Sequence, residues 1–278
     1  MSEWSRNTAW RQGQLLSDEA VSIIGLRHQE SPDDTLVIMA THSCDLAQFS
    51  VREPQVEIIV GRRIYQLDGN NTHAKSSRTL HVKFEGEEPL LAEFVVTEKR
   101  FVTKNELANF EPDTCFHLTP ASLATFQVWL ASRYRRSAFP DEFESRMSES
   151  KLSSKISKII KPLGEMVTAV FFDVDEGREI EKTGTDDTYL LDIVLLHAVE
   201  PDFEAAETVT VKAVEAIQRA FRKKLFDGET GIWKDIELRH VDAVSEDSLS
   251  YRQSQLLKKW RLDHISLGAD PQQPILAE

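Results

Sequence analysis

The sequence has few cysteines and no long apolar segment. Its only cysteines, Cys44 and Cys115, are too few for a disulfide framework. The first residues, MSEWSRNTAW, contain neither the basic nor the apolar part of a secretory signal. The longest apolar runs, MVTAVFF and YLLDIVLLHAV, have about half of the ~20 residues that a membrane-spanning helix needs. We therefore expect a cytoplasmic protein without a membrane span.

The sequence also lacks the common motifs of catalysis and nucleotide binding. It has no phosphate-loop glycine pattern, no G-x-S-x-G, no H-E-x-x-H and no Rossmann fingerprint. We expect no cofactor and no bound metal ion.

Positive charge is scarce, with 33 Lys and Arg residues against 46 Asp and Glu residues. The formal charge of -13 repels phosphate over a Debye length of ~8 to 10 Å. If the protein contacts RNA or DNA, we expect the contact to run through a few clustered arginines, namely Arg62, Arg63, Arg133, Arg135 and Arg136. The lysines of KLSSKISKIIK are interpreted as a solvated helix face.

The residues that are present divide the chain into two regions. Residues 1–118 contain short β-rich runs, namely TLVIM, QVEIIVGRRIYQL, RTLHVKF, LLAEFVV and RFVTK. Turn-forming segments separate these runs, and this spacing is typical of a compact antiparallel barrel or sandwich. We expect a β-rich, barrel-like domain in which residues 36–39 form a buried strand.

The second region combines helices and strands. Thr119 and a proline in the first turn mark the start of a helix, and a second helical pattern covers SESKLSSKISKIIKPL. MVTAVFFDV and YLLDIVLLHAV indicate a hairpin, followed by a helix, the strand DIELRHVDAV and a final helix YRQSQLLKKWRLDHI. The fold class is therefore α+β, with an α+β domain over 119–268 and a disordered tail over 269–278.

The stretch THSCDLAQ, residues 41–48, suggests a reactive site at the end of a strand. A thiol near helix amides can have a lowered pKa and act as a nucleophile. His42 diverges from Cys44 once the chain turns, so a histidine from NNTHAK or TLH is a candidate base. The first hypothesis is a hydrolase or nuclease, whose site would contain His42, Cys44, Asp45, Arg62, Arg63 and His73.

Two other hypotheses remain open for the same residues. In the first, Cys44 is a small buried side chain, Asp45 caps the turn and His42 bonds a backbone carbonyl. The protein is then a non-enzymatic regulatory or assembly subunit that binds a protein partner or another copy of itself. In the second, HSC at 42–44 and CFH at 115–117 supply the ligands of a zinc-stabilised binding module, although their spacing is unusual for zinc.

Two carboxylates of the second region lie on one strand face. Asp173 and Asp175 belong to the segment FFDVDEG, and such a pair can hold a divalent metal ion. A polar hairpin end is the simpler interpretation.

The order WRQGQLL, LVIMATHSCDLA and EPQVEIIVGR resembles uncharacterised bacterial proteins with a W-x-Q-G and H-x-C-D-L module. More distantly, roughly the first 65 residues resemble the start of the MazF/PemK toxin barrel. That family cuts RNA through its 2′-hydroxyl with an arginine near the first turn, which Arg11 matches, and a later threonine or serine. The later strand IIVGRRI lacks the Pro-x-Thr pattern. The resemblance implies an effector of a bacterial defence or toxin system.

Overall fold

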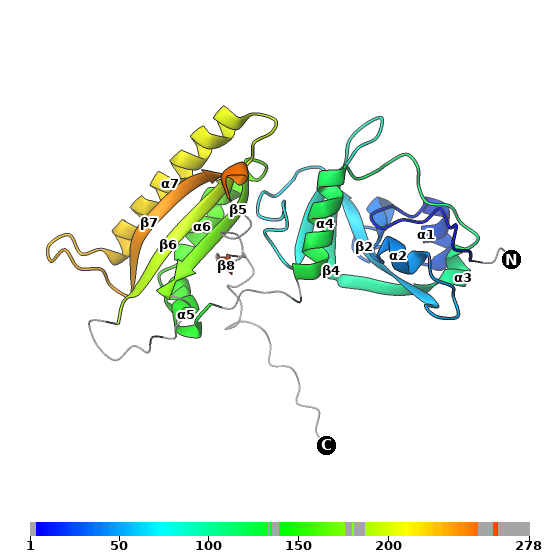
Figure 1. Ribbon diagram of the computed structural model, residues 1–278, viewed down its shortest axis with the longest axis horizontal. Helices are drawn as coiled ribbons and strands as arrows, with labels where there is room; N and C mark the ends of the chain where they lie inside the picture. Colours follow the sequence, from blue (N-terminus) through cyan, green and yellow to red (C-terminus); the bar gives the residue numbers. More distant parts are fainter. Residues whose placement is uncertain are drawn as a thin grey trace, which may run out of the picture. The chain divides into compact units, whose positions relative to one another are not determined.

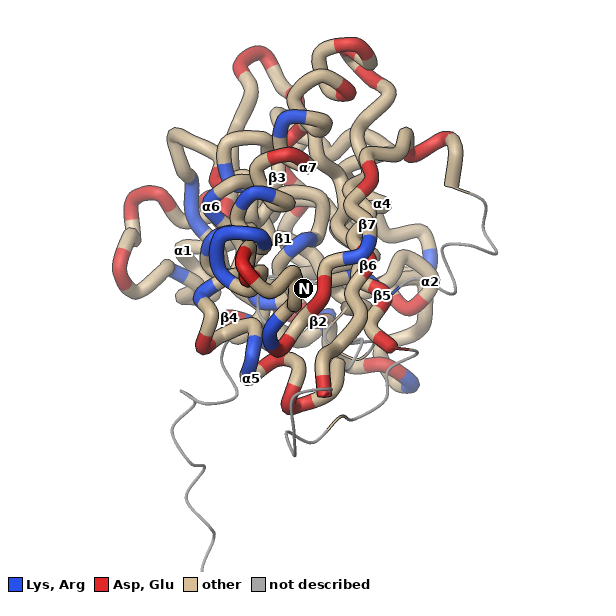
Figure 2. Tube along the Cα trace, turned by 90° about the vertical axis from the view of Figure 1, so that its left-hand side faces the viewer, with Lys and Arg blue, Asp and Glu red and all other residues tan. Residues whose placement is uncertain are grey.

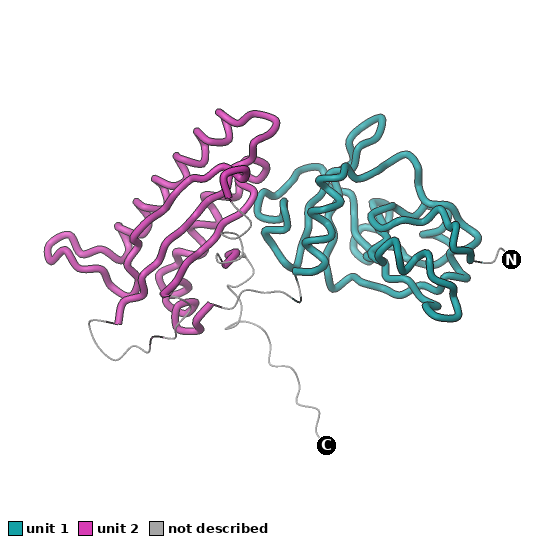
Figure 3. The backbone as a smooth tube through the Cα atoms, in the orientation of Figure 1, with its two compact units in different colours: residues 1–135 teal, residues 136–278 magenta. Residues whose placement is uncertain are grey.

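The computed structural model describes residues 4–132, 134, 139–175, 180, 187–249 and 258–260. The chain forms two compact units, residues 1–135 (unit 1) and 136–278 (unit 2), shown in Figure 3. The division lies after the boundary at residue 118 that the sequence predicted. Arg133, Arg135, Arg136 and the tail 269–278 lie outside the described residues.

Unit 1 is built on a four-stranded antiparallel sheet with the order β1-β2-β4-β3. The strands are β1 (Thr35–Met39), β2 (Gln55–Ile64), β3 (Thr79–Phe84) and β4 (Leu90–Thr103). Residues 36–39 lie within β1 as predicted, and Val37, Ile38 and Met39 are fully buried. The runs LLAEFVV and RFVTK, expected as separate strands, form the single strand β4.

The sheet of unit 1 is open in the part of the chain that the structure describes. The edge strands β1 and β3 pair with β2 and β4, and no described pairing joins the two edges. The mixed α+β class is therefore present, and a closed barrel is not among the described pairings. A register shift occurs between Ile59 and Gly61, where a Cβ on Gly61 would lie 2.3 Å from the carbonyl oxygen of Glu93.

Helices cover both faces of this sheet (Figure 1). On one face, α4 (Pro120–Ser132) buries Phe126 and Trp129 against β3 and β4. This packing places α4 in unit 1, which explains why the boundary lies after residue 135. On the other face lie α1 (Asp18–Ile24), α2 (Ser43–Leu46) and α3 (Lys104–Leu107), together with Trp4 and Trp10.

Unit 2 contains a second sheet with the order β7-β6-β5-β8. Its elements are α5 (Asp141–Glu149), α6 (Leu152–Ile160), β5 (Val167–Val174), β6 (Tyr189–His197), α7 (Phe203–Leu225), β7 (Ile236–Ser245) and β8 (Lys258–Lys259). The 3₁₀ helices within the described residues are η1 (Pro32–Asp34), η2 (Lys161–Leu163) and η4 (Glu246–Ser248).

The three α-helices described in unit 2 pack on one face of its sheet and share a single apolar core. β5 and β6 form the predicted hairpin, and α7 connects the parallel strands β6 and β7. The final helix expected over 251–265 falls mostly outside the described residues. Within it, Lys258 and Lys259 form β8 instead, because they pair with Phe172 and Phe171 of β5. None of the described helices is long and apolar enough to cross a membrane.

Candidate functional site

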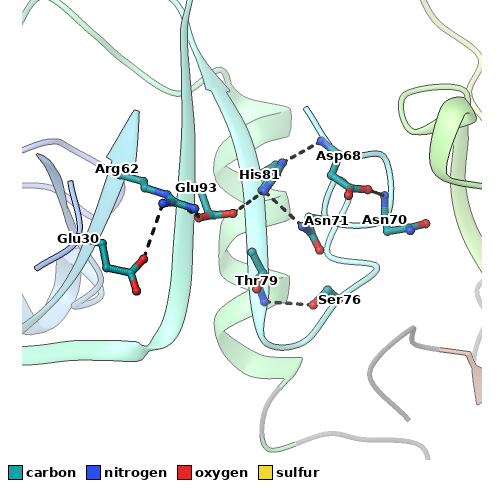
Figure 4. Close-up of polar contacts among 9 residues, drawn as sticks. All are labelled: Glu30, Arg62, Asp68, Asn70, Asn71, Ser76, Thr79, His81 and Glu93. Atoms are coloured by element: carbon teal, nitrogen blue, oxygen red, sulfur yellow. Dashed lines mark hydrogen bonds and ion pairs between the residues drawn. The ribbon is translucent and has the colours of Figure 1, made fainter. Parts of the chain in front are cut away.

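A row of charged side chains crosses three strands of unit 1. In the strand register, Arg62 of β2 and His81 of β3 both lie opposite Glu93 of β4. Arg62 donates from Nε and from Nη2 to Glu93 Oε1, each at 2.8 Å. His81 Nε2 lies 3.0 Å from Glu93 Oε2. Figure 4 shows Glu93 between the other two side chains.

The contacts of His81 determine which ring nitrogen carries the proton. The backbone N–H of Asp68 donates to Nδ1 at 2.9 Å, so Nδ1 is an acceptor and is unprotonated. The neutral ring therefore carries its hydrogen on Nε2 and donates it to Glu93. Both nitrogens of His81 are thus engaged within the protein, and the ring is only 6% exposed.

Glu93 remains ionised because of this row. The hydrogen bond from His81 and the charge and hydrogen bonds of Arg62 lower its pKa below the ordinary value of 4.5, against the opposing effect of burial. The outer side of Arg62 faces Glu30 at 4.0 Å. The guanidinium is therefore held mainly by carboxylates of its own unit.

The row anchors the loop between β2 and β3, residues 65–78. Besides the contact of Asp68, the backbone N–H of His81 donates to the carbonyl of Asn71 at 2.9 Å. The loop covers the free edge of β3, and its buried polar residues are Thr72, Lys75, Ser76 and Ser77. His73, one of the predicted site residues, lies in this loop with a left-handed backbone (φ 52°).

The stretch THSCDLAQ forms the short helix α2 after β1. His42 is its N-cap residue, and its Nδ1 accepts a hydrogen bond from the backbone N–H of Cys44 at 3.3 Å. The cap is therefore His42, where Asp45 was the expected capping residue. Cys44 is exposed, which corrects the interpretation of its thiol as a small buried side chain.

A buried lysine that the sequence did not single out holds this turn. Lys104 is fully buried, and its Nζ donates to the carbonyls of Asp45 at 2.7 Å and Gln48 at 2.9 Å. Trp4 Nε1 donates to the carbonyl of Leu46 at 2.8 Å. Burial lowers the pKa of Lys104, and the charges of Glu53 and Asp45 oppose the shift.

The predicted site residues fall into two separate groups. Arg62 lies opposite Thr35, the first residue of β1, whereas His42 lies three residues beyond Met39, the last residue of that strand. β1 is roughly 15 Å long at ~3.4 Å per residue, so the two groups lie at opposite ends of it. The group of His42 and Cys44 therefore does not meet the group of Arg62. Arg63 is exposed and its guanidinium lies 5.5 Å from the ring centre of Tyr65.

The remaining candidates lie apart from both groups. Arg11 is exposed and donates to the carbonyls of Thr8 and Trp10. Cys115 is exposed. Asp175 accepts a hydrogen bond from the backbone N–H of Leu190 at the end of the β5–β6 hairpin. Within the described residues, no three His, Cys, Asp or Glu side chains gather closely enough to hold a metal ion.

One sequence pattern would have allowed part of the charged row to be predicted. In TLHVKF and LLAEFVV the apolar residues alternate, which places His81 and Glu93 on the opposite strand face. The pairing of these two residues depends on the register, which the sequence alone does not state. No protein-family model, no curated protein and no solved structure matches this chain.

Proposed function

We propose that the chain is a non-enzymatic regulatory or assembly subunit that binds a protein partner through unit 1. The observation that carries this proposal is the loop tip at residues 49–51, which directly follows THSCDLAQ. Phe49 is 62% exposed and Val51 is 97% exposed. Isolated apolar residues are common on surfaces, but here two of them share one tip. An apolar pocket on a partner would bury both side chains.

The base of this loop is held more firmly than a surface turn requires. Three donor contacts from Trp4 and Lys104 bind the carbonyls of Asp45, Leu46 and Gln48. Taking an ammonium group out of water is costly unless its donors are satisfied. A loop that is rigid before binding loses little conformational entropy on binding, which favours a role in recognition.

The contacts of the charged row support the same proposal. Arg62, Glu93 and His81 satisfy one another and hold the loop 65–78. A general base needs a nitrogen or oxygen that is accessible to the substrate, and both nitrogens of His81 are already engaged. The row therefore favours a structural role for these groups.

A second candidate function is a hydrolase or nuclease centred on His42, Cys44 and Asp45. The observation that favours it is the exposure of the Cys44 thiol on the first turn of α2. In either case the resemblance of residues 1–65 implies a cytoplasmic component of a bacterial defence or toxin system.

A barrel-like closure of unit 1 would require contacts beyond the described strand pairs.

Site-specific photocrosslinking tests the proposal. A photoreactive phenylalanine analogue replaces Phe49 in one variant and Val128, which is 52% exposed on α4, in the control. We expect a specific partner to be captured only from position 49. With that partner purified, Phe49→Ser combined with Val51→Ser weakens binding at least about tenfold, because a buried Phe or Val contributes ~1.5 to 3 kcal/mol.

The matched control is Val128→Ser, which should leave the affinity unchanged. Equal capture from both positions, or unchanged affinity of the loop variant, contradicts the proposal. Hydrolysis of a phosphodiester or ester substrate that disappears in Cys44→Ala would favour the second candidate instead.

A further inference from the structure

Two stripes of lysines lie side by side on unit 2, one on α6 and one on α7. On α6 they are Lys151, Lys155 and Lys158, and on α7 they are Lys223 and Lys224. The apolar side of α6 packs Leu152, Ile156 and Ile160 into the core. The apolar side of α7 packs Phe221 and Leu225 into the same core. The lysines therefore lie on the flanks of the two helices, where they reach solvent.

The stripes line one groove with a volume of about 550 Å³. Its lining residues are Ser150, Lys151, Leu152, Ser154, Lys155, Lys158, Ala220, Lys223 and Lys224. No carboxylate is among the described residues that line the groove. Figure 2 marks Lys and Arg in blue and Asp and Glu in red along the Cα trace, with α6 and α7 labelled.

The groove lysines have no counter-charges within the described part of the chain. None of the five forms an ion pair with a described residue. Four other cations of unit 2 do, namely Arg146 with Glu142, Arg219 with Glu215, Lys234 with Asp227 and Arg239 with Asp192. In a chain of formal charge -13, carboxylates are abundant, yet none of the described ones lines the groove.

Local stability explains only part of this arrangement. Lys223 and Lys224 lie in the last turn of α7, where positive charge favours the helix dipole. On α6 the positive charge of Lys151 is unfavourable, because Lys151 is the N-cap residue and lies at the positive end of the helix dipole. The first turn of α6 also has no acidic residue and no side-chain cap. An anion in the groove would neutralise the lysines and stabilise the N-terminal end of α6.

We infer that this groove binds the sugar-phosphate backbone of a nucleic acid. A chain of regularly spaced phosphates can contact both stripes at once, and each contact releases counterions. Lysine binds phosphate as a point charge, whereas arginine forms planar bidentate contacts with bases. The described lining of the groove contains no arginine and no aromatic side chain. Binding is therefore to the backbone, independent of sequence and without base stacking.

The concave shape distinguishes this ligand from other anions. A membrane surface would contact protruding basic residues, whereas these lysines line a groove between two helices. A single phosphate would engage only part of a site that extends along α6 from Lys151 to Lys158, a rise of ~10 Å. The sequence predicted a solvated lysine face and placed any nucleic-acid contact at Arg62, Arg63, Arg133, Arg135 and Arg136. Of these arginines, Arg62 pairs with Glu93 and the last three lie outside the described residues, whereas the groove lysines form no ion pair with a described residue.

Fluorescence anisotropy of the full chain with a labelled 20-base-pair DNA duplex tests the inference. For about four phosphate contacts, the slope of log K against log salt is roughly -3.6, so binding weakens about a hundredfold between 50 and 200 mM salt. Lys155→Gln combined with Lys223→Gln should reduce the magnitude of this slope by about 2 and weaken binding equally for unrelated sequences. The arginine variant of the same two positions should retain binding.

The matched control removes two charges of unit 2 outside the groove, Lys212→Gln with Lys234→Gln, and should bind like the original chain. Equal losses in both glutamine variants would overturn the groove as the site, as would absence of duplex binding by the original chain at 25 mM salt. Two further probes are poly-glutamate and vesicles of anionic lipid. Groove-dependent binding to either probe, without binding to the duplex, would replace nucleic acid with an acidic peptide or a lipid headgroup.

Discussion

Glu93 and His81 lie directly opposite each other on β4 and β3, with Oε2 and Nε2 3.0 Å apart. The other oxygen of Glu93 accepts from Arg62, and the other nitrogen of His81 accepts from the backbone of Asp68. A single carboxylate thus connects the middle of the sheet to the loop 65–78.

Replacing this carboxylate should loosen the loop. Glu93→Gln removes the charge from hydrogen bonds worth ~1.5 to 3 kcal/mol each, so we expect a loss of about 2 kcal/mol in the free energy of unfolding. In the Glu93→Gln variant, the amides of residues 65–78 should exchange with deuterium faster than in the original chain. The amides of α4 should exchange at the same rate in both. The pKa of Glu93 is lowered in the folded state, so its contribution is present above pH 4.5 and is lost as the pH falls through the folded value. An equal free energy of unfolding for Glu93→Gln and the original chain at neutral pH would contradict this account.

Lys104 should be essential to the turn that carries Phe49. Lys104→Met preserves much of the side-chain volume but leaves the carbonyls of Asp45 and Gln48 without their donor. We expect a loss of about 2 to 3 kcal/mol in urea denaturation. As a control, Lys99→Met breaks a partly exposed ion pair with Glu57 and should cost less than about 1 kcal/mol. Similar losses in the two variants would refute the anchoring role.

His42 and Cys44 should differ in their effects on stability. His42→Ala removes a helix cap and should lower the free energy of unfolding by about 0.5 to 1 kcal/mol. Cys44→Ala replaces an exposed side chain and should change the free energy of unfolding by less than about 0.5 kcal/mol. With both thiols exposed, Cys44 and Cys115 should react with iodoacetamide at comparable rates. Much faster labelling of Cys44, slowed by His42→Ala, would instead favour the hydrolase.

Glu144 should make unit 2 sensitive to pH. Burial raises its pKa from 4.5 to about 7, and the charge of Asp141 adds to the rise. The folded state binds the proton more tightly than the unfolded state, so stability falls as the pH rises from about 4.5 to about 7 and then levels off.

Glu144→Gln therefore should raise the Tm above pH 7 and have little effect below pH 4.5. Thermal unfolding followed by circular dichroism at both ends of this range measures the difference. The control Glu149→Gln removes the same charge from an exposed position of α5 and should lack this pH dependence. A constant effect of Glu144→Gln at all pH values would rule out the proposed titration.

Local patterns in the sequence determined much of the secondary structure. The apolar run TLVIM is β1, the hydroxyl and proline at 119 and 120 mark the start of α4, and the apolar runs of β5 and β6 form the expected hairpin. These features depend on neighbouring residues, because turn chemistry and hydrophobic periodicity act over a few positions. The mixed α+β class follows from the same patterns.

The tertiary structure alone decided which distant groups meet. Strand register brings Arg62, His81 and Glu93 together, and chain folding brings Lys104 to carbonyls 56 and 59 residues away. The buried faces of Phe126 and Trp129 assign α4 to unit 1, and the groove exists only because α6 packs beside α7. Each of these contacts joins segments that are remote in sequence, and their pairing depends on how the apolar faces pack in three dimensions, which no local pattern specifies.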